Sequence, residues 1–232
     1  MGNVPQSIVV LISADAEWRG VLQAFPDADC QLSPYGEWFV HALPGPRDDL
    51  QPPVFLHGGW GKIAAAASTA YAIERWQPGL VVNLGTCGGF AGKVERGQTL
   101  LVDETLVYDI VEQMGDPEAA REHYTTRLDL GWLPGILPPG VRRGRLVSAD
   151  RDILPQDIAM LIERFGAIAA DWESGAIAWV AARHKTRCLI LRAVSDLVGQ
   201  TGGEAYGNPE LFESYAHEIM RRLVNILGQI LP

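Results

Sequence analysis

Four segments place acidic or hydroxyl side chains directly after short apolar runs that are typical of buried strands. They are residues 13–17 (SADAE), 83–89 (NLGTCGG), 171–173 (DWE) and 192–196 (RAVSD). Ligands of open α/β sheets bind just beyond the carboxyl ends of the strands, so we expect these segments to meet at one site. Carboxyl groups brought together in this way can act as a general acid and a general base.

Each acidic side chain also has a structural explanation. Asp196 could cap a helix or stabilise a turn, and Glu173 and Glu17 could place their charge at a helix N-terminus. The glycines of residues 85–92 resemble a dinucleotide fingerprint only loosely, because the GxGxxG spacing is missing. Four such features at consecutive strand ends favour one shared site over four separate structural roles.

Strands alternate with helices along the chain, which predicts an α/β fold in a single domain over residues 1–232. The expected strands are residues 8–12, 80–84, 99–102, 106–108, 146–148, 168–170 and 188–194, with a hairpin or outer pair at 35–42 and 52–57. The expected helices are residues 16–25, 62–76, 155–165, 174–183 and 210–231. We also expect a glycine-rich turn at 85–92 and a long, loosely structured loop over 113–145.

Composition limits the classes of partner. The chain has 232 residues and a formal net charge of −9, which argues against binding to nucleic acid. Its three cysteines lie far apart and show no zinc-ligand spacing, so we expect no metal, no cofactor and a reducing, cytoplasmic setting. The N-terminal apolar run is too short for a membrane span and lacks the basic residues of a signal peptide.

Longer segments carry a resemblance to a known family. VVNLGTCGGFAGKVERGQTLLVDETLVYD is similar to the NTGxAGG…GD…V.D signature of the 5′-methylthioadenosine/S-adenosylhomocysteine nucleosidases and their phosphorylase relatives. AIAADWESGAIAWVAARHKTRCLILRAVSDLVG resembles their VEMExAAIAxV…RAISD signature, and GGWGKIAAAAS and LISADAEW follow the family order. The resemblance implies a three-layer α/β/α sandwich around a mixed, partly barrel-like sheet, commonly assembled as a homodimer in nucleosidases.

The resemblance also implies hydrolysis of the N-glycosidic bond of a purine nucleoside, with adenine as the expected base, in methionine salvage. Asp196 would protonate the leaving purine at N7, and Ser195 would orient that carboxyl group. Glu173 would accept hydrogen bonds from the ribose hydroxyls. Glu17 would activate the attacking water, with Asp15 as the fallback for this role.

Further roles follow from the same resemblance. Thr86 would bond the water or a ribose oxygen, and Arg192 would position the water or the carboxylates. The backbone of Ile153 would contact the base. Trp172 stands where the family has a methionine that packs on the ribose. Phe212, in the closing helix, is a candidate cover for the base or the 5′ substituent.

Water is favoured over phosphate as the acceptor. Phosphorylase relatives commonly place an arginine where this chain has Asn83, and they begin with a glycine-rich, arginine-bearing segment where this chain has residues 13–17. A glutamate there would repel phosphate and activate water, although Arg19 could supply a nearby positive charge. A phosphorylase and a non-catalytic nucleoside-binding protein remain the alternatives.

Three departures from the family pattern leave the substrate open. Trp172 replaces the methionine, and Asp171 is one methylene shorter than the usual glutamate. Asp152 stands where the family often has an aromatic residue against the base. Its carboxylate could recognise a nitrogen of the base or point into solvent.

Overall fold

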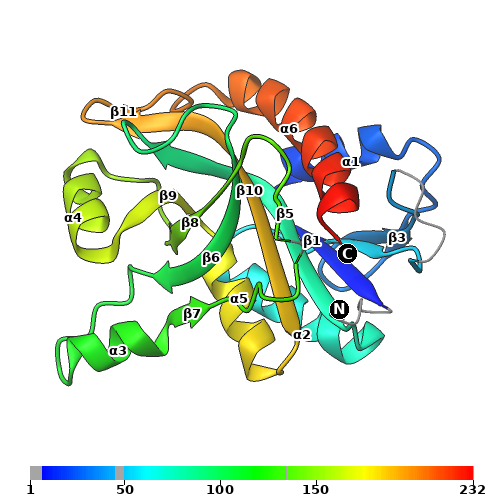
Figure 1. Ribbon diagram of the computed structural model, residues 1–232, viewed down its shortest axis with the longest axis horizontal. Helices are drawn as coiled ribbons and strands as arrows, with labels where there is room; N and C mark the ends of the chain where they lie inside the picture. Colours follow the sequence, from blue (N-terminus) through cyan, green and yellow to red (C-terminus); the bar gives the residue numbers. More distant parts are fainter. Residues whose placement is uncertain (1–6, 45–49, 134, 232) are drawn as a thin grey trace.

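The computed structural model describes residues 7–44, 50–133 and 135–231 (Figure 1). The strands are β1 (Ile8–Ile12), β2 (Gln31–Leu32), β3 (Glu37–Val40), β4 (Val54–His57), β5 (Leu80–Phe90), β6 (Thr99–Val107), β7 (Thr125–Arg127), β8 (Val141–Ser148), β9 (Ala167–Asp171), β10 (Arg187–Gly199) and β11 (Gly202–Gly203). The helices are α1 (Asp15–Ala24), α2 (Lys62–Trp76), α3 (Pro117–His123), α4 (Pro155–Phe165), α5 (Ser174–Arg183) and α6 (Pro209–Ile230).

The described strands form one mixed sheet that closes on itself in its central part. The order β10-β6-β8-β9-β5 returns to its start because β10 also pairs with β5. From β5 the sheet continues outward through β1, β4, β3 and β2. Strand β5 pairs in parallel with β1 and β10 but antiparallel with β9. The mixed, partly barrel-like sheet predicted from the sequence is confirmed.

Helices cover the sheet on both faces, which gives the predicted three layers. Helices α1 and α6 pack on each other over one face, and α2 and α5 pack on each other over the opposite face (Figure 1). Two separate apolar clusters fill the spaces under these helix pairs. Strand β1 is buried along its whole length, since helices cover the sheet on both faces. Its sequence is accordingly a continuous apolar run without polar alternation.

The glycine-rich segment 85–92 is mostly not the turn that the sequence predicts. Strand β5 runs through it as far as Phe90. A Cβ atom on Gly85 would lie 1.9 Å from Nη1 of Arg192, and one on Gly88 would lie 2.7 Å from Cδ1 of Ile153. These glycines therefore serve close packing within a strand, where other side chains need the space.

The prediction of a loose loop over residues 113–145 is wrong in part. Helix α3, strand β7 and the first half of β8 lie within it. The helix begins after Asp116, whose carboxylate accepts hydrogen bonds from the N–H groups of Glu118 at 2.9 Å and Ala119 at 3.3 Å. The expected outer pair is confirmed as the antiparallel strands β3 and β4. None of the described helices is both long and apolar enough to cross a membrane.

Candidate active site

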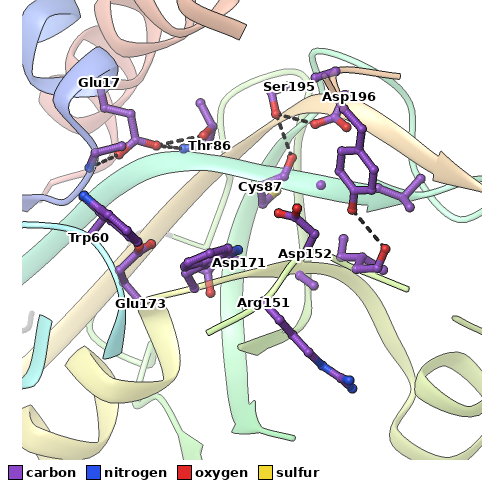
Figure 2. Close-up of a pocket in the computed structure, with 18 of the residues that line it drawn as sticks. Glu17, Trp60, Thr86, Cys87, Arg151, Asp152, Asp171, Glu173, Ser195 and Asp196 are labelled. Atoms are coloured by element: carbon purple, nitrogen blue, oxygen red, sulfur yellow. Dashed lines mark hydrogen bonds between the residues drawn. The ribbon is translucent and has the colours of Figure 1, made fainter. Parts of the chain in front are cut away.

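A cavity of about 440 Å³ opens beside the carboxyl-terminal parts of β1, β5, β9 and β10, within the size range of small-molecule sites (Figure 2). Seven of the side chains expected at the site line it: Glu17, Thr86, Ile153, Trp172, Glu173, Ser195 and Asp196. Arg192 lies beneath the cavity wall and is fully buried. Phe212 belongs to α6, but its side chain lies outside the described residues.

Glu17 joins the first helix to strand β5. It stands in the first turn of α1, where one carboxyl oxygen accepts from the N–H of Ala14 at 3.2 Å. The other oxygen accepts from the N–H and the hydroxyl of Thr86, at 2.6 and 2.8 Å (Figure 2). Glu17 therefore both caps the start of α1 and lies at the site, because one carboxyl oxygen bonds the helix N-terminus and the other bonds Thr86.

Arg192 holds the acidic groups together from below. Its Nη2 lies 2.7 Å from Oδ2 of Asp171 and 3.6 Å from Oε2 of Glu173, and its Nη1 lies 3.8 Å from Oε1 of Glu17. Burial opposes a charged guanidinium, yet the surrounding carboxylates outweigh it and raise the pKa of Arg192 above its usual value. A buried, permanently charged group fixes where the carboxylates stand.

The sequence did not reveal the other partners of Arg192. Its Nη2 donates to the side-chain oxygen of Asn83 at 2.7 Å, and its Nε donates to the Ser174 hydroxyl at 3.0 Å. Ser174 also donates from its N–H to the carboxylate of Asp171. In the sequence, Asn83 stands out only because phosphorylases commonly have an arginine at that position. In the structure, Asn83 helps to hold Arg192 of the neighbouring strand β10.

Glu173 stands at the N-cap position of α5 without capping it. Its Oε1 accepts instead from the N–H of Gly61 at 2.9 Å, in the loop before α2. Burial raises the pKa of Glu173 to about 8; Arg192 opposes this shift, and Asp171 adds to it. A neutral Glu173 near pH 7 can both donate to and accept from a ribose hydroxyl.

The raised pKa of Glu173 predicts a stability that falls as pH rises. Between about pH 4.5 and 8 the unfolded chain ionises this group while the folded protein keeps its proton, so unfolding is favoured progressively. Glu173→Gln should flatten this part of the profile. Urea unfolding at pH 5.5, 6.5 and 7.5 measures it, and equal slopes for the two proteins would contradict the assignment.

Asp196 and Ser195 enter the cavity from a bulge in β10. The register of β10 against β5 shifts between Val194 and Asp196, which leaves Ser195 as the extra residue. Its hydroxyl lies 2.8 Å from Oδ1 of Asp196, and the buried Oδ2 of Asp196 has no side-chain partner among the described residues. Burial raises the pKa of Asp196, while the Ser195 bond acts in the opposite direction. A raised pKa and an oxygen without a side-chain partner suit a proton donor.

Tyr206 is a further cavity residue that the sequence did not reveal. Its hydroxyl donates to the carbonyl oxygen of Ile153 at 3.0 Å. Burial raises the pKa of Tyr206 to about 12, and the charge of Asp152 adds to this effect. An aromatic residue within a glycine-rich loop before the closing helix was the available signal. Among the described residues, no group of histidine, cysteine and acidic side chains is arranged to hold a metal ion.

The family model described as the phosphorylase superfamily matches residues 49–231. The chain belongs to this superfamily.

Its relatives include nucleosidases. The 5′-methylthioadenosine/S-adenosylhomocysteine nucleosidase of Oceanobacillus iheyensis is 25% identical over 200 residues, which cover 76% of this chain and 81% of the relative. The nucleosidase of the same name from Colwellia psychrerythraea is 27% identical over 196 residues, covering 76% and 79% of the two chains.

Solved structures of such nucleosidases share the fold. The Helicobacter pylori protein with butyl-thio-DADMe-Immucillin-A has a TM-score of 0.77 at 16% identity, covering 97% of this chain and 98% of that one. The Neisseria meningitidis protein with methylthio-immucillin-A has a TM-score of 0.74 at 20% identity, covering 97% and 99%.

Two side chains that the sequence leaves as alternatives, Arg19 for phosphate binding and Asp15 for water activation, do not line the cavity. Arg19 is half-exposed and pairs with Glu213 at 2.8 Å, so its charge is engaged on the surface. Asp15 is exposed and faces His57, with 3.2 Å between the carboxylate oxygen and the ring nitrogen. The geometry therefore favours Glu17 over Asp15 as the acidic group of this segment.

Proposed function

We propose that this chain hydrolyses the N-glycosidic bond of purine nucleosides, with 5′-substituted adenine nucleosides of the kind named for its relatives as the expected substrates. The observation that carries the proposal is the arrangement of carboxyl groups around one cavity. Glu17 and Glu173 lie toward one end of it, and Asp196 lies at the other (Figure 2). A nucleoside placed between them would present its base to Asp196 and its sugar to Glu173.

The reaction balances with these groups alone. The bond between C1′ and N9 breaks, and its electron pair goes to the purine as Asp196 gives its proton to N7. The oxygen of a water molecule forms the new bond to C1′, and Glu17 takes the proton that this water loses. Thr86 holds Glu17 at the attack side, and Arg192 acts as a positioning residue through the carboxylates.

The pairing of the nearby arginines with carboxylates supports water over phosphate. Five acidic side chains line it: Glu17, Asp152, Asp171, Glu173 and Asp196. Arg192 exposes only 1% of its side chain and is engaged by carboxylates, while Arg151 pairs with Asp157 at 2.7 Å. Binding of phosphate would need a cationic side chain that is not already paired with a carboxylate.

Incubation with 5′-methylthioadenosine in phosphate-free buffer tests the proposal. Release of free adenine and the reducing sugar is expected, at a rate that added phosphate leaves unchanged. Formation of a ribose 1-phosphate derivative only when phosphate is present would show the phosphorylase alternative. Saturable binding without any release of base would show a nucleoside-binding protein.

We further propose that the protein acts as a homodimer in the cytoplasm, in methionine salvage. Exposed apolar side chains support the dimer: Ile63, Val111 and Met114. The ion pair of Lys62 with Asp109 brings these two segments together. Ile63→Asp should convert a dimer to a monomer in light scattering after size exclusion, and a monomeric wild-type protein would contradict the proposal.

A further inference from the structure

Two tryptophans form an open corner at the edge of the cavity. Trp60 lies in the loop before α2, and Trp172 lies between β9 and α5. Their ring centroids are 5.7 Å apart, and the rings are inclined at 62°. Trp60 is 62% exposed although it lines the cavity, so most of its indole surface is free for a ligand.

The corner is held at a fixed place relative to the acidic groups. The residue after Trp60, Gly61, donates its N–H to Glu173 at 2.9 Å, and the N–H of Lys62 donates to Asp150 at 2.7 Å. Figure 2 shows Trp60 beside Glu173 and at the opposite end of the cavity from Asp196. If the base lies at Asp196 and the ribose at Glu173, the substituent on C5′ is directed toward this corner.

Acidic side chains flank the corner, and one of them, Asp171, is paired with Arg192 at 2.7 Å. The carboxyl groups of Glu173 and Asp171 lie beside it in the sequence and in the cavity. Figure 2 shows the guanidinium of Arg151 turned away from the cavity, and that group lies 5.4 Å from the Tyr108 ring centre. The cavity lining thus supplies two indole rings and acidic groups without a free cation among the described side chains.

We propose that this corner binds a positively charged 5′ substituent, and that the substrates include nucleosides carrying a sulfonium or ammonium group there. Indole faces attract cations through their quadrupole more strongly than other aromatic rings do. The indoles are the part of the corner that discriminates by charge, because Asp171 is paired with Arg192 and Glu173 is neutral near pH 7. The inference rests on the proposed function for the orientation of the nucleoside, and it adds no chemical step to hydrolysis.

A matched pair of ligands tests the charge alone. 5′-Methylthioadenosine and its S-methyl sulfonium derivative differ by one methyl group and one positive charge. We expect the sulfonium to bind about 3- to 30-fold more tightly, the range from an exposed to a desolvated cation–π contact. Titration calorimetry with Asp196→Asn measures both dissociation constants, because turnover in this variant is expected to be slow on the timescale of the titration.

A matched set of variants assigns the preference to the indoles. Trp60→Leu and Trp172→Leu keep apolar bulk but remove the π face, so the sulfonium preference should disappear while the thioether binds within about 3-fold of its former affinity. Trp179→Leu is the control, because Trp179 lies on α5 outside the cavity lining and contacts Arg183. It should leave both constants unchanged.

The outcomes separate this inference from the proposed function. Equal affinity of Asp196→Asn with both tryptophans intact for the two ligands would overturn it, as would an equal loss for both ligands when Trp60→Leu is added. In the latter case the indole is only an apolar cover. Failure of the wild-type protein to release base from either ligand would reject hydrolysis, while a sulfonium preference in binding would still stand.

Discussion

Replacing Asp196 by asparagine is expected to lower kcat for base release by about 10³-fold, within the range of roughly 10² to 10⁴ for loss of a general acid. Burial raises the pKa of Asp196, so the carboxyl group keeps its proton nearer to neutral pH than an exposed aspartate does. Its buried Oδ2 has no side-chain partner among the described residues, so it can meet the leaving base. Asparagine keeps the shape and the bond to Ser195 but has no acidic proton.

The pH profile adds an independent readout. If Asp196 must be protonated, kcat falls as pH rises through its pKa, and this limb is missing from the residual activity of Asp196→Asn. Asp152→Asn is the matched control, because Asp152 lines the same cavity and undergoes the same chemical change. We expect less than about a 10-fold change there, since no proton transfer is assigned to it. Similar losses in the two variants would reject Asp196 as the proton donor.

The strand-end acids were predictable because local pattern and position suffice for them. Buried strands end at small and acidic residues, and parallel strands bring those ends to one edge of the sheet. Glu17, Glu173 and Asp196 were placed in the cavity on this basis, and they line it. The choice between capping and chemistry was not predictable, because it depends on a bulge in β10 and on the N–H of Gly61 in a distant loop.

Other features depend on contacts between distant segments. In the sequence, Gly85 looks like a turn residue; in the fold, it leaves space for the side chain of Arg192. Asn83 by itself indicates only the absence of a phosphate-binding arginine, but its side chain accepts a hydrogen bond from Arg192. Tyr206 and Trp60 carry no periodic signal, since each lies in a glycine-rich loop. Secondary structure within residues 113–145 was missed because its elements are short and its strands are stabilised by pairing with β6.

The second large effect concerns stability. Arg192→Met should lower the free energy of unfolding by about 3–5 kcal/mol, the cost of removing one partner from a buried ionic cluster. Asp171 would then stand beside Glu173 and Glu17 without the guanidinium that compensates them, and Asn83 would lose its buried donor. Urea unfolding measures the loss. Arg19→Met is the control, because the exposed pair with Glu213 is worth at most about 1 kcal/mol.

A second substitution distinguishes lost charge compensation from lost packing. If the cost comes from an uncompensated carboxylate, adding Asp171→Asn to Arg192→Met should recover part of the stability, because the remaining buried charge is reduced. A cavity or strain left by the arginine would not respond, and the two losses would then add. The double variant should stay inactive in either case, since Glu17 and Glu173 would lose the group that fixes their positions. Recovery of stability without activity would therefore identify Arg192 as the residue that holds mutually repelling acids where the proposed reaction needs them.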